Sequence, residues 1–150
     1  MSIRFDVSEA FMAIGIIVIS ADERCTAKET AMMLEMFKSL DLLSVDPNED
    51  YEEAWEALFD RTLAKIDRVF PNRDLSLSDA QLTLLISAIY QSIPKDRAEM
   101  LFRLAVAVAV ADGIEPRELD IIKRLKKAFK IDPELTRKIV AESKAMALKS

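Results

Sequence analysis

Residues 104–131 read LAVAVAVADGIEPRELDIIKRLKKAFKI, and this stretch decides the fold. Its first part, residues 104–111, contains only Ala, Leu and Val, which predicts a helix that is buried on nearly all sides. Gly113 should end that helix, because glycine readily adopts the left-handed conformation that closes helices. Pro116 suits the first turn of a second helix, where its missing N–H costs nothing. The stretch therefore predicts a helical hairpin in which a sharp elbow joins a buried helix to an amphipathic basic helix.

A related pattern lies near the N-terminus, where residues 11–22 read FMAIGIIVISAD and are followed by ERCTAKETAMMLEMFKSLDLL. The Ala-Asp pair at residues 21–22 aligns with the pair at residues 111–112, and one extra residue in the first elbow places Glu29 opposite Glu118. The apolar positions of the two following helices then coincide: Met32 and Met33 lie opposite Ile121 and Ile122, Met36 opposite Leu125, Leu40 opposite Phe129, and Leu42 opposite Ile131. We interpret this match as a duplicated helical hairpin.

The composition favours helices throughout. The chain has 150 residues, of which 51% are hydrophobic, and it contains only two glycines and five prolines. Long helices with short turns fit this composition better than a strand-rich fold. A chain of this length forms one domain and buries roughly 70% of its unfolded surface without needing a structural ion. The sequence predicts a single all-α domain over residues 1–150, a compact bundle of about seven helices with two pseudo-symmetric hairpins.

Capping patterns mark where several of these helices begin. A Ser, Thr or Asp followed three residues later by Glu or Gln satisfies free N–H groups in the first turn of a helix. Asp-Pro is a related start signal, with the aspartate as cap and the proline in the first turn. The predicted starts use Asp6 with Glu9, Thr26 with Glu29, Ser78 with Gln81, and Asp132 with Pro133.

Residue types that are absent or rare exclude several functional classes. The chain has no histidine, which excludes His-based nucleophilic triads and the Glu-x-x-His ligand pairs of di-iron bundles. One cysteine cannot form the usual zinc site, and two glycines are too few for a phosphate-binding loop. We therefore expect a protein that is not an enzyme and that binds no nucleotide.

Two features predict a cytoplasmic location. The lone Cys25 cannot form an internal disulfide, which is typical of proteins in reducing compartments. The longest apolar runs, residues 10–19 and 104–111, are shorter than the roughly 20 residues that cross a bilayer.

The elbows carry carboxylates that need a physical explanation. Asp112 would lie at the negative end of its helix dipole, which disfavours a carboxylate by about 0.3–1 kcal/mol. It could cap the next helix, as Glu29 could by reaching back to the Thr26 N–H. Alternatively, carboxylates from more than one elbow could share Ca2+, Mg2+ or Mn2+, which prefer oxygen ligands. The spacing does not fit an EF-hand loop, so the candidate metal ligands are Asp22, Glu29, Asp112 and Glu118.

The charges are unevenly distributed. Residues 41–60 contain eight carboxylates and no Lys or Arg, whereas residues 115–150 contain ten basic and six acidic side chains. Such runs usually mark solvated faces, but they can also dock partners. The candidate partner-binding residues are Lys123, Lys126, Lys127 and Lys130. We expect them to meet an acidic protein, a second copy of the chain or an anionic membrane surface, and not nucleic acid, because the chain is acidic overall and few aromatics lie among these lysines.

The second hairpin resembles the tellurite-resistance TerB-like family. The resemblance rests on Ala111, Asp112 and Gly113, followed by Pro116, Glu118, Ile121, Ile122, Leu125 and Phe129. It implies a compact all-helical domain of two related halves, in a cytoplasmic bacterial protein associated with stress or tellurite resistance and with the membrane face. It also implies that the acidic elbow residues hold a divalent cation. The first half departs from the pattern, with Glu23 in place of the glycine and Ala27 in place of the proline.

Two functions from different classes follow. In the first, Asp22, Glu29, Asp112 and Glu118 bind a hard cation that sets the angle between the hairpins. In the second, the chain is a metal-free interaction scaffold that docks through its acidic and basic faces.

Overall fold

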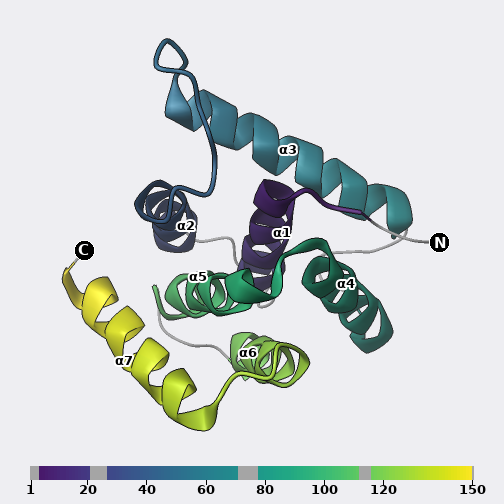
Figure 1. Ribbon diagram of the computed structural model, residues 1–150, viewed down its shortest axis with the longest axis vertical. Coiled ribbons are helices and arrows are strands. Elements are labelled where there is room, and N and C mark those ends of the chain that lie inside the picture. Colours follow the sequence, from purple (N-terminus) through teal and green to yellow (C-terminus); the bar gives the residue numbers. More distant parts are fainter. Residues whose placement is uncertain (1–3, 21–26, 71–77, 112–115, 150) are drawn as a thin grey trace.

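The computed structural model describes residues 4–20, 27–70, 78–111 and 116–149 (Figure 1). These residues form seven α-helices and one short 3-10 helix, and no strand occurs among them. The elements are α1 (Val7–Ser20), α2 (Ala27–Ser39), α3 (Tyr51–Val69), α4 (Asp79–Ser92), η1 (Lys95–Arg97), α5 (Ala98–Val110), α6 (Pro116–Ala128) and α7 (Pro133–Lys149). The predicted all-α bundle is confirmed.

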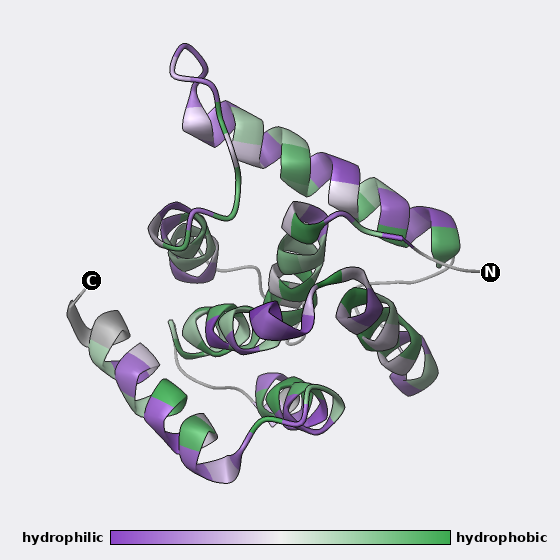
Figure 2. Cartoon of the chain, in the orientation of Figure 1, coloured by the Kyte–Doolittle hydropathy of each residue, from purple (hydrophilic) through white to green (hydrophobic). Residues whose placement is uncertain are grey.

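Two apolar helices, α1 and α5, form the centre of the molecule and pack against each other. The residues of α1 from Ala10 to Ile14 and those of α5 from Leu104 to Ala109 are at most 1% exposed. Helices α3 and α4 pack on α1, whereas α2, α6 and α7 pack on α5 (Figure 1). The outer helices are amphipathic, with hydrophilic residues toward solvent (Figure 2). No helix in the described ranges combines the length and apolarity needed to cross a membrane.

Helix starts follow the predicted capping signals wherever the structure describes them. Asp6 and Glu9 exchange hydrogen bonds, with each backbone N–H donating to the other side chain, at 2.9 and 2.8 Å. Ser78 and Gln81 form the same reciprocal box at the start of α4. Asp132 caps α7 by accepting the Glu134 N–H at 3.1 Å. The Thr26 box falls outside the described residues, as do the elbows at residues 21–26 and 112–115.

Helices α2 and α6 share their length and their C-terminal geometry. Each has 13 residues and is followed by a residue with positive φ, Asp41 at 53° and Lys130 at 55°. In both cases the backbone N–H of the residue that follows donates a hydrogen bond back to a carbonyl in the last turn of the helix. Leu42 donates to the Phe37 carbonyl and Ile131 to the Lys126 carbonyl, both at 3.0 Å. This is the Schellman arrangement, which satisfies carbonyls that the helix leaves free. The two ends agree with the predicted alignment, while the pseudo-symmetry of the whole hairpins stays a prediction.

Close packing joins the N-terminal elements. Gly15 of α1 lies against Met33 of α2, and a Cβ at this position would overlap the Met33 sulfur. Trp55 of α3 is 5% exposed, as expected for a core anchor, and contacts the rings of Phe37 and Phe59. The large aromatic side chains thus fill the space between α2 and α3.

Candidate functional site

Two of the predicted metal ligands occupy matching positions. Glu29 is the third residue of α2 and Glu118 is the third residue of α6, and both helices follow a buried apolar helix. Their exposed fractions are 2% and 1%. A glutamate in the first turn of a helix is stabilised by the positive end of the helix dipole. Two acidic side chains are therefore buried at the same position of α2 and α6.

The burial of these carboxylates requires compensation. Removing an ionised carboxylate from water is costly unless hydrogen-bond donors or a cation replace the lost hydration. The free N–H groups at a helix start can act as hydrogen-bond donors to such a carboxylate. A divalent cation bound by the carboxylate would replace the lost hydration in the other way. Glu29 and Glu118 offer only oxygen ligands, which suit Ca2+, Mg2+ and Mn2+. The described members of the predicted set therefore fit a hard cation, and they fit helix capping as well.

The other two predicted ligands, Asp22 and Asp112, lie outside the described residues. Within the part of the chain that the structure describes, no three Asp, Glu or Cys side chains gather closely enough to hold a metal ion. A cation site built from the predicted set therefore depends on carboxylates contributed by the elbows. Asp22 and Asp112 stay predictions.

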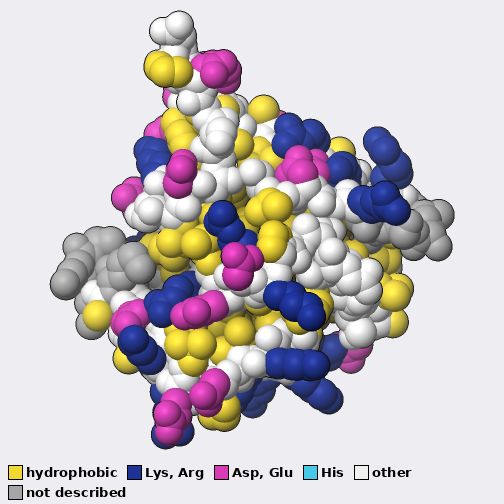
Figure 3. Space-filling model, viewed as in Figure 1, with side chains coloured by type: hydrophobic (Ala, Val, Ile, Leu, Met, Phe, Trp, Pro, Cys, Tyr) yellow, Lys and Arg dark blue, Asp and Glu magenta, His cyan; other side chains and the backbone are white. Residues whose placement is uncertain are grey.

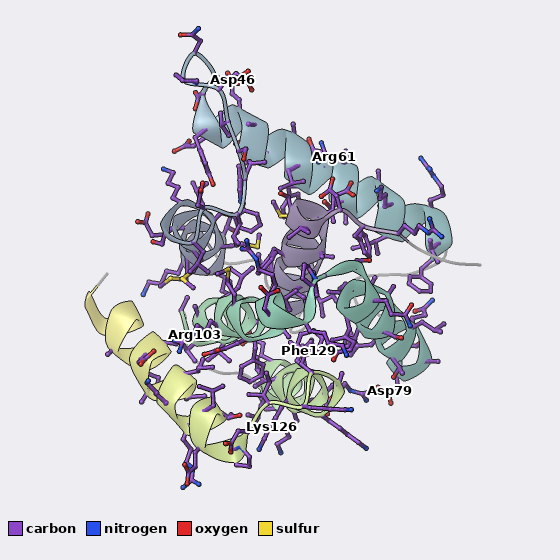
Figure 4. The ribbon with its side chains drawn as sticks, viewed as in Figure 1. Asp46, Arg61, Asp79, Arg103, Lys126 and Phe129 are labelled. Atoms are coloured by element: carbon purple, nitrogen blue, oxygen red, sulfur yellow. The ribbon has the colours of Figure 1, made fainter. Side chains whose placement is uncertain are left out.

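The predicted partner-binding lysines lie on the solvent side of α6 and just beyond its C-terminal end. Lys123, Lys127 and Lys130 are exposed and Lys126 is half-buried. Lys126 is labelled in Figure 4. None of the four forms an ion pair with any residue in the described ranges. These four lysines are called the basic face below.

Arg124 of the same helix has a different environment. Its guanidinium donates hydrogen bonds to Asp120 and to Asp79 of α4, both at 3.0 Å. The bond to Asp120 raises the pKa of Arg124 above its usual value, and the charge of Asp79 acts in the same direction. Arg124 therefore joins α6 to α4, and its charge is neutralised locally.

The acidic stretch lies at the other end of the molecule. Its eight carboxylates, called the acidic face below, are all exposed: Asp41, Asp46, Glu49, Asp50, Glu52, Glu53, Glu56 and Asp60. Asp50 caps α3 by accepting the Glu52 N–H at 3.0 Å. Across the described ranges, no member of the acidic face forms an ion pair with Lys or Arg. Acidic side chains appear at the protruding end of the molecule in Figure 3, and basic ones gather at the opposite edge over α6.

One buried charge cluster was not predicted from the sequence. The carboxylate of Glu9 accepts hydrogen bonds from Lys65 Nζ at 2.6 Å and from Arg61 Nε at 3.0 Å, and its side chain is 3% exposed. Burial acts to raise the pKa of Glu9, but the hydrogen bonds from Lys65, the Asp6 N–H and Arg61 outweigh it, so the pKa lies below its usual value. This cluster fastens the start of α1 to the middle of α3.

Residues 8–141 match the family model described as tellurite resistance protein TerB. The chain belongs to the TerB family. The match begins in the first turn of α1 and ends within α7, so both charged faces lie inside it. No curated protein and no solved structure matches the chain.

Positions on single helices of this TerB domain were predictable, whereas contacts between helices were not. The exposed lysines follow from the amphipathic pattern of α6, and the first-turn position of Glu118 follows from Pro116. Glu9 was identified only as a cap, because its cationic partners are 52 and 56 residues away in the sequence. The only local signal was the spacing of Arg61 and Lys65, which places two cations on one face of α3.

Proposed function

We propose that this chain is a non-enzymatic TerB domain that binds a divalent cation through Asp22, Glu29, Asp112 and Glu118. Ca2+ is the first candidate, with Mg2+ and Mn2+ as alternatives, because the ligands are all carboxylate oxygens. A cation held by both elbows would set the angle between the two hairpins. Membership of the TerB family supports a role in a cytoplasmic stress response related to tellurite resistance.

The burial of Glu29 and Glu118 is the observation that carries this proposal. Both are at most 2% exposed and occupy the third position of their helices. A side chain that served only as a solvated surface charge would not need such burial, since Glu is almost never fully buried unless it is paired. The predicted alignment places an elbow aspartate before each of them, which would complete a set of four carboxylates.

Calorimetric titration with Ca2+, Mg2+ and Mn2+, together with thermal unfolding, tests the proposal. An ion present at 100 times its dissociation constant should stabilise the folded chain by about 2.7 kcal/mol, because it binds only that state. Asp112→Asn and Glu118→Gln should abolish the titration heat and the rise in melting temperature. Glu35→Gln is the matched control, because Glu35 is an exposed carboxylate of α2 and its loss should change neither. No binding heat and no stabilisation with any of the three ions would refute cation binding.

A second function is supported by a separate observation: among the residues that the structure describes, the acidic and basic faces form no ion pairs. In this alternative the chain docks a protein partner or an anionic membrane surface without a metal. Docking should weaken with salt, persist in chelator and disappear when Lys126 and Lys127 are both replaced by Glu. Pull-down from lysate and sedimentation with anionic vesicles, each with and without chelator, separate this function from cation binding.

A further inference from the structure

We propose that the acidic face of one molecule binds the basic face of the next, so that copies of this chain associate head to tail. The inference rests on the docking function proposed above and identifies the partner as a second copy. It is independent of the cation site.

The two faces retain their charge because no residue in the described ranges neutralises them. Several other cations of the described ranges are paired: Arg61 and Lys65 with Glu9, Arg103 with Glu99 and Glu142, and Arg124 with Asp79 and Asp120. The lysines of the basic face and the carboxylates of the acidic face have no such partners there. Their fields therefore extend into solvent, where each attracts a surface of opposite charge.

The faces lie at opposite ends of the molecule. With the long axis vertical, Asp46 is labelled near the upper end and Lys126 near the lower end (Figure 4). They are thus too far apart to satisfy each other within one molecule, and each is open to a neighbour. A single contact between two molecules leaves one acidic and one basic face free for further growth.

Charge also selects the symmetry of association. In a twofold dimer whose axis passes through one of the two faces, that face meets its own copy, which would bring lysines against lysines or carboxylates against carboxylates. Like charges placed together across an interface are costly. A head-to-tail contact between opposite ends places each face against the opposite charge, and it forms a ring or an open chain depending on the rotation between neighbours.

The spacing of the exposed charges defines a register. On α3, Glu53, Glu56 and Asp60 are separated by three and then four residues, and all three are exposed. On α6, the exposed Lys123 and Lys127 are separated by four residues, the same spacing as Glu56 and Asp60. Each of these pairs spans about 6 Å at 1.5 Å per residue. Two helices laid antiparallel would therefore pair Asp60 with Lys123 and Glu56 with Lys127, while Lys130 lies just beyond the end of α6.

The test is sedimentation velocity of the full chain over a range of protein concentrations, at about 10 mM and about 1 M NaCl, where the Debye length is about 30 Å and about 3 Å. At low salt the average mass should rise with concentration past that of a dimer. At high salt the chain should be monomeric, and chelator should have no effect at either salt. Association that stops at a dimer, or that persists in 1 M NaCl, would overturn the proposal.

Charge-swap variants test the register. Glu56→Lys and Lys127→Glu should each lose the concentration-dependent rise in mass, and the double variant should regain it, because each interface again contains an opposite pair. Glu35→Lys and Lys95→Glu make the same changes in net charge at exposed positions outside both faces and should associate like the wild type. If the double variant does not regain the concentration-dependent rise in mass, the register is wrong.

A chain that stays monomeric at low salt, yet captures a partner or anionic vesicles through its lysines, would refute self-association and leave the docking function standing.

Discussion

Replacing Glu9 by Gln should test the buried charge cluster that joins α1 to α3. Gln is nearly the same size as Glu and can still accept the Asp6 N–H, so the reciprocal cap at the start of α1 is retained. What is lost is the negative charge beside Lys65 and Arg61, which lie 2.6 and 3.0 Å away. The substitution therefore removes the charge and the oxygen that accepts from Arg61, while the cap of α1 is kept.

The expected loss follows from the hydrogen bonds involved. A hydrogen bond to a charged group contributes about 1.5–3 kcal/mol and a neutral one about 0.5–1.5 kcal/mol. Gln keeps one acceptor oxygen for Lys65 but carries NH2 in place of the oxygen that accepts from Arg61, so weakening the first bond and losing the second costs about 2.5–4.5 kcal/mol. The larger losses known for broken buried pairs do not apply in full, because the side chains of Arg61 and Lys65 are 53% and 35% exposed. These cations can turn to water when their partner is lost. We expect the free energy of unfolding to fall by about 2.5 kcal/mol, the lower end of that range, once this return to water is counted.

Urea unfolding followed by circular dichroism measures this loss, and its pH dependence provides the sharper check. The pKa of folded Glu9 is lowered, so its contribution to stability is present above the unfolded-state pKa, about 4.3, and is lost as the pH falls through the folded value. The difference between wild type and Glu9→Gln should be constant near neutral pH and shrink below about pH 4.3. Asp79→Asn is the control, since Asp79 is 89% exposed and its ion pair with Arg124 should contribute about 0.2–1 kcal/mol. A loss for Glu9→Gln no greater than that of the control, or a difference that does not vary with pH, would refute this account.

Two further substitutions test backbone and packing features. Gly15→Ala should destabilise the chain by about 1 kcal/mol in urea unfolding, because overpacking against Met33 costs about 1–3 kcal/mol and exceeds the roughly 1 kcal/mol gained in helix propensity. Adding Met33→Ala should make the Gly15→Ala step favourable, and an unchanged cost would contradict the predicted overlap. Lys130→Gly should raise the melting temperature by removing a left-handed conformation that costs an L-residue about 1–2 kcal/mol. Asp41→Gly should give a smaller gain, because Asp tolerates this conformation better, and a larger gain at Asp41 than at Lys130 would contradict this reasoning.

Local features of the fold were predictable because short-range interactions determine them. The boxes of Asp6 with Glu9 and of Ser78 with Gln81 start α1 and α4 as the sequence predicted, since both partners lie within one helical turn. The apolar run at residues 104–111 predicted the most buried part of α5 for a similar reason: a helix without a polar side has no face to expose.

The candidate site was predictable only in part. The pattern placed Glu118 in the first turn of α6 and the lysines on its outer side, but it could not determine whether Glu118 would be buried or exposed. Burial depends on the packing of α6 against α5 and against α4, and α4 is not adjacent to α6 in the sequence. Nor could the pattern separate Arg124, which is neutralised by Asp79, from Lys127, which is not.

The sequence by itself determined the helical class, most helix starts, the family and the separation of acidic and basic segments, because these depend on composition and on neighbours within a turn or two. Only the tertiary structure decided which charges are neutralised. It brought Lys65 to Glu9 and Arg124 to Asp79, and it held the acidic face and the basic face at opposite ends of the molecule. The physical reason is that pairing needs a contact of about 3 Å, and for residues far apart in the chain such contacts are set by how the helices pack.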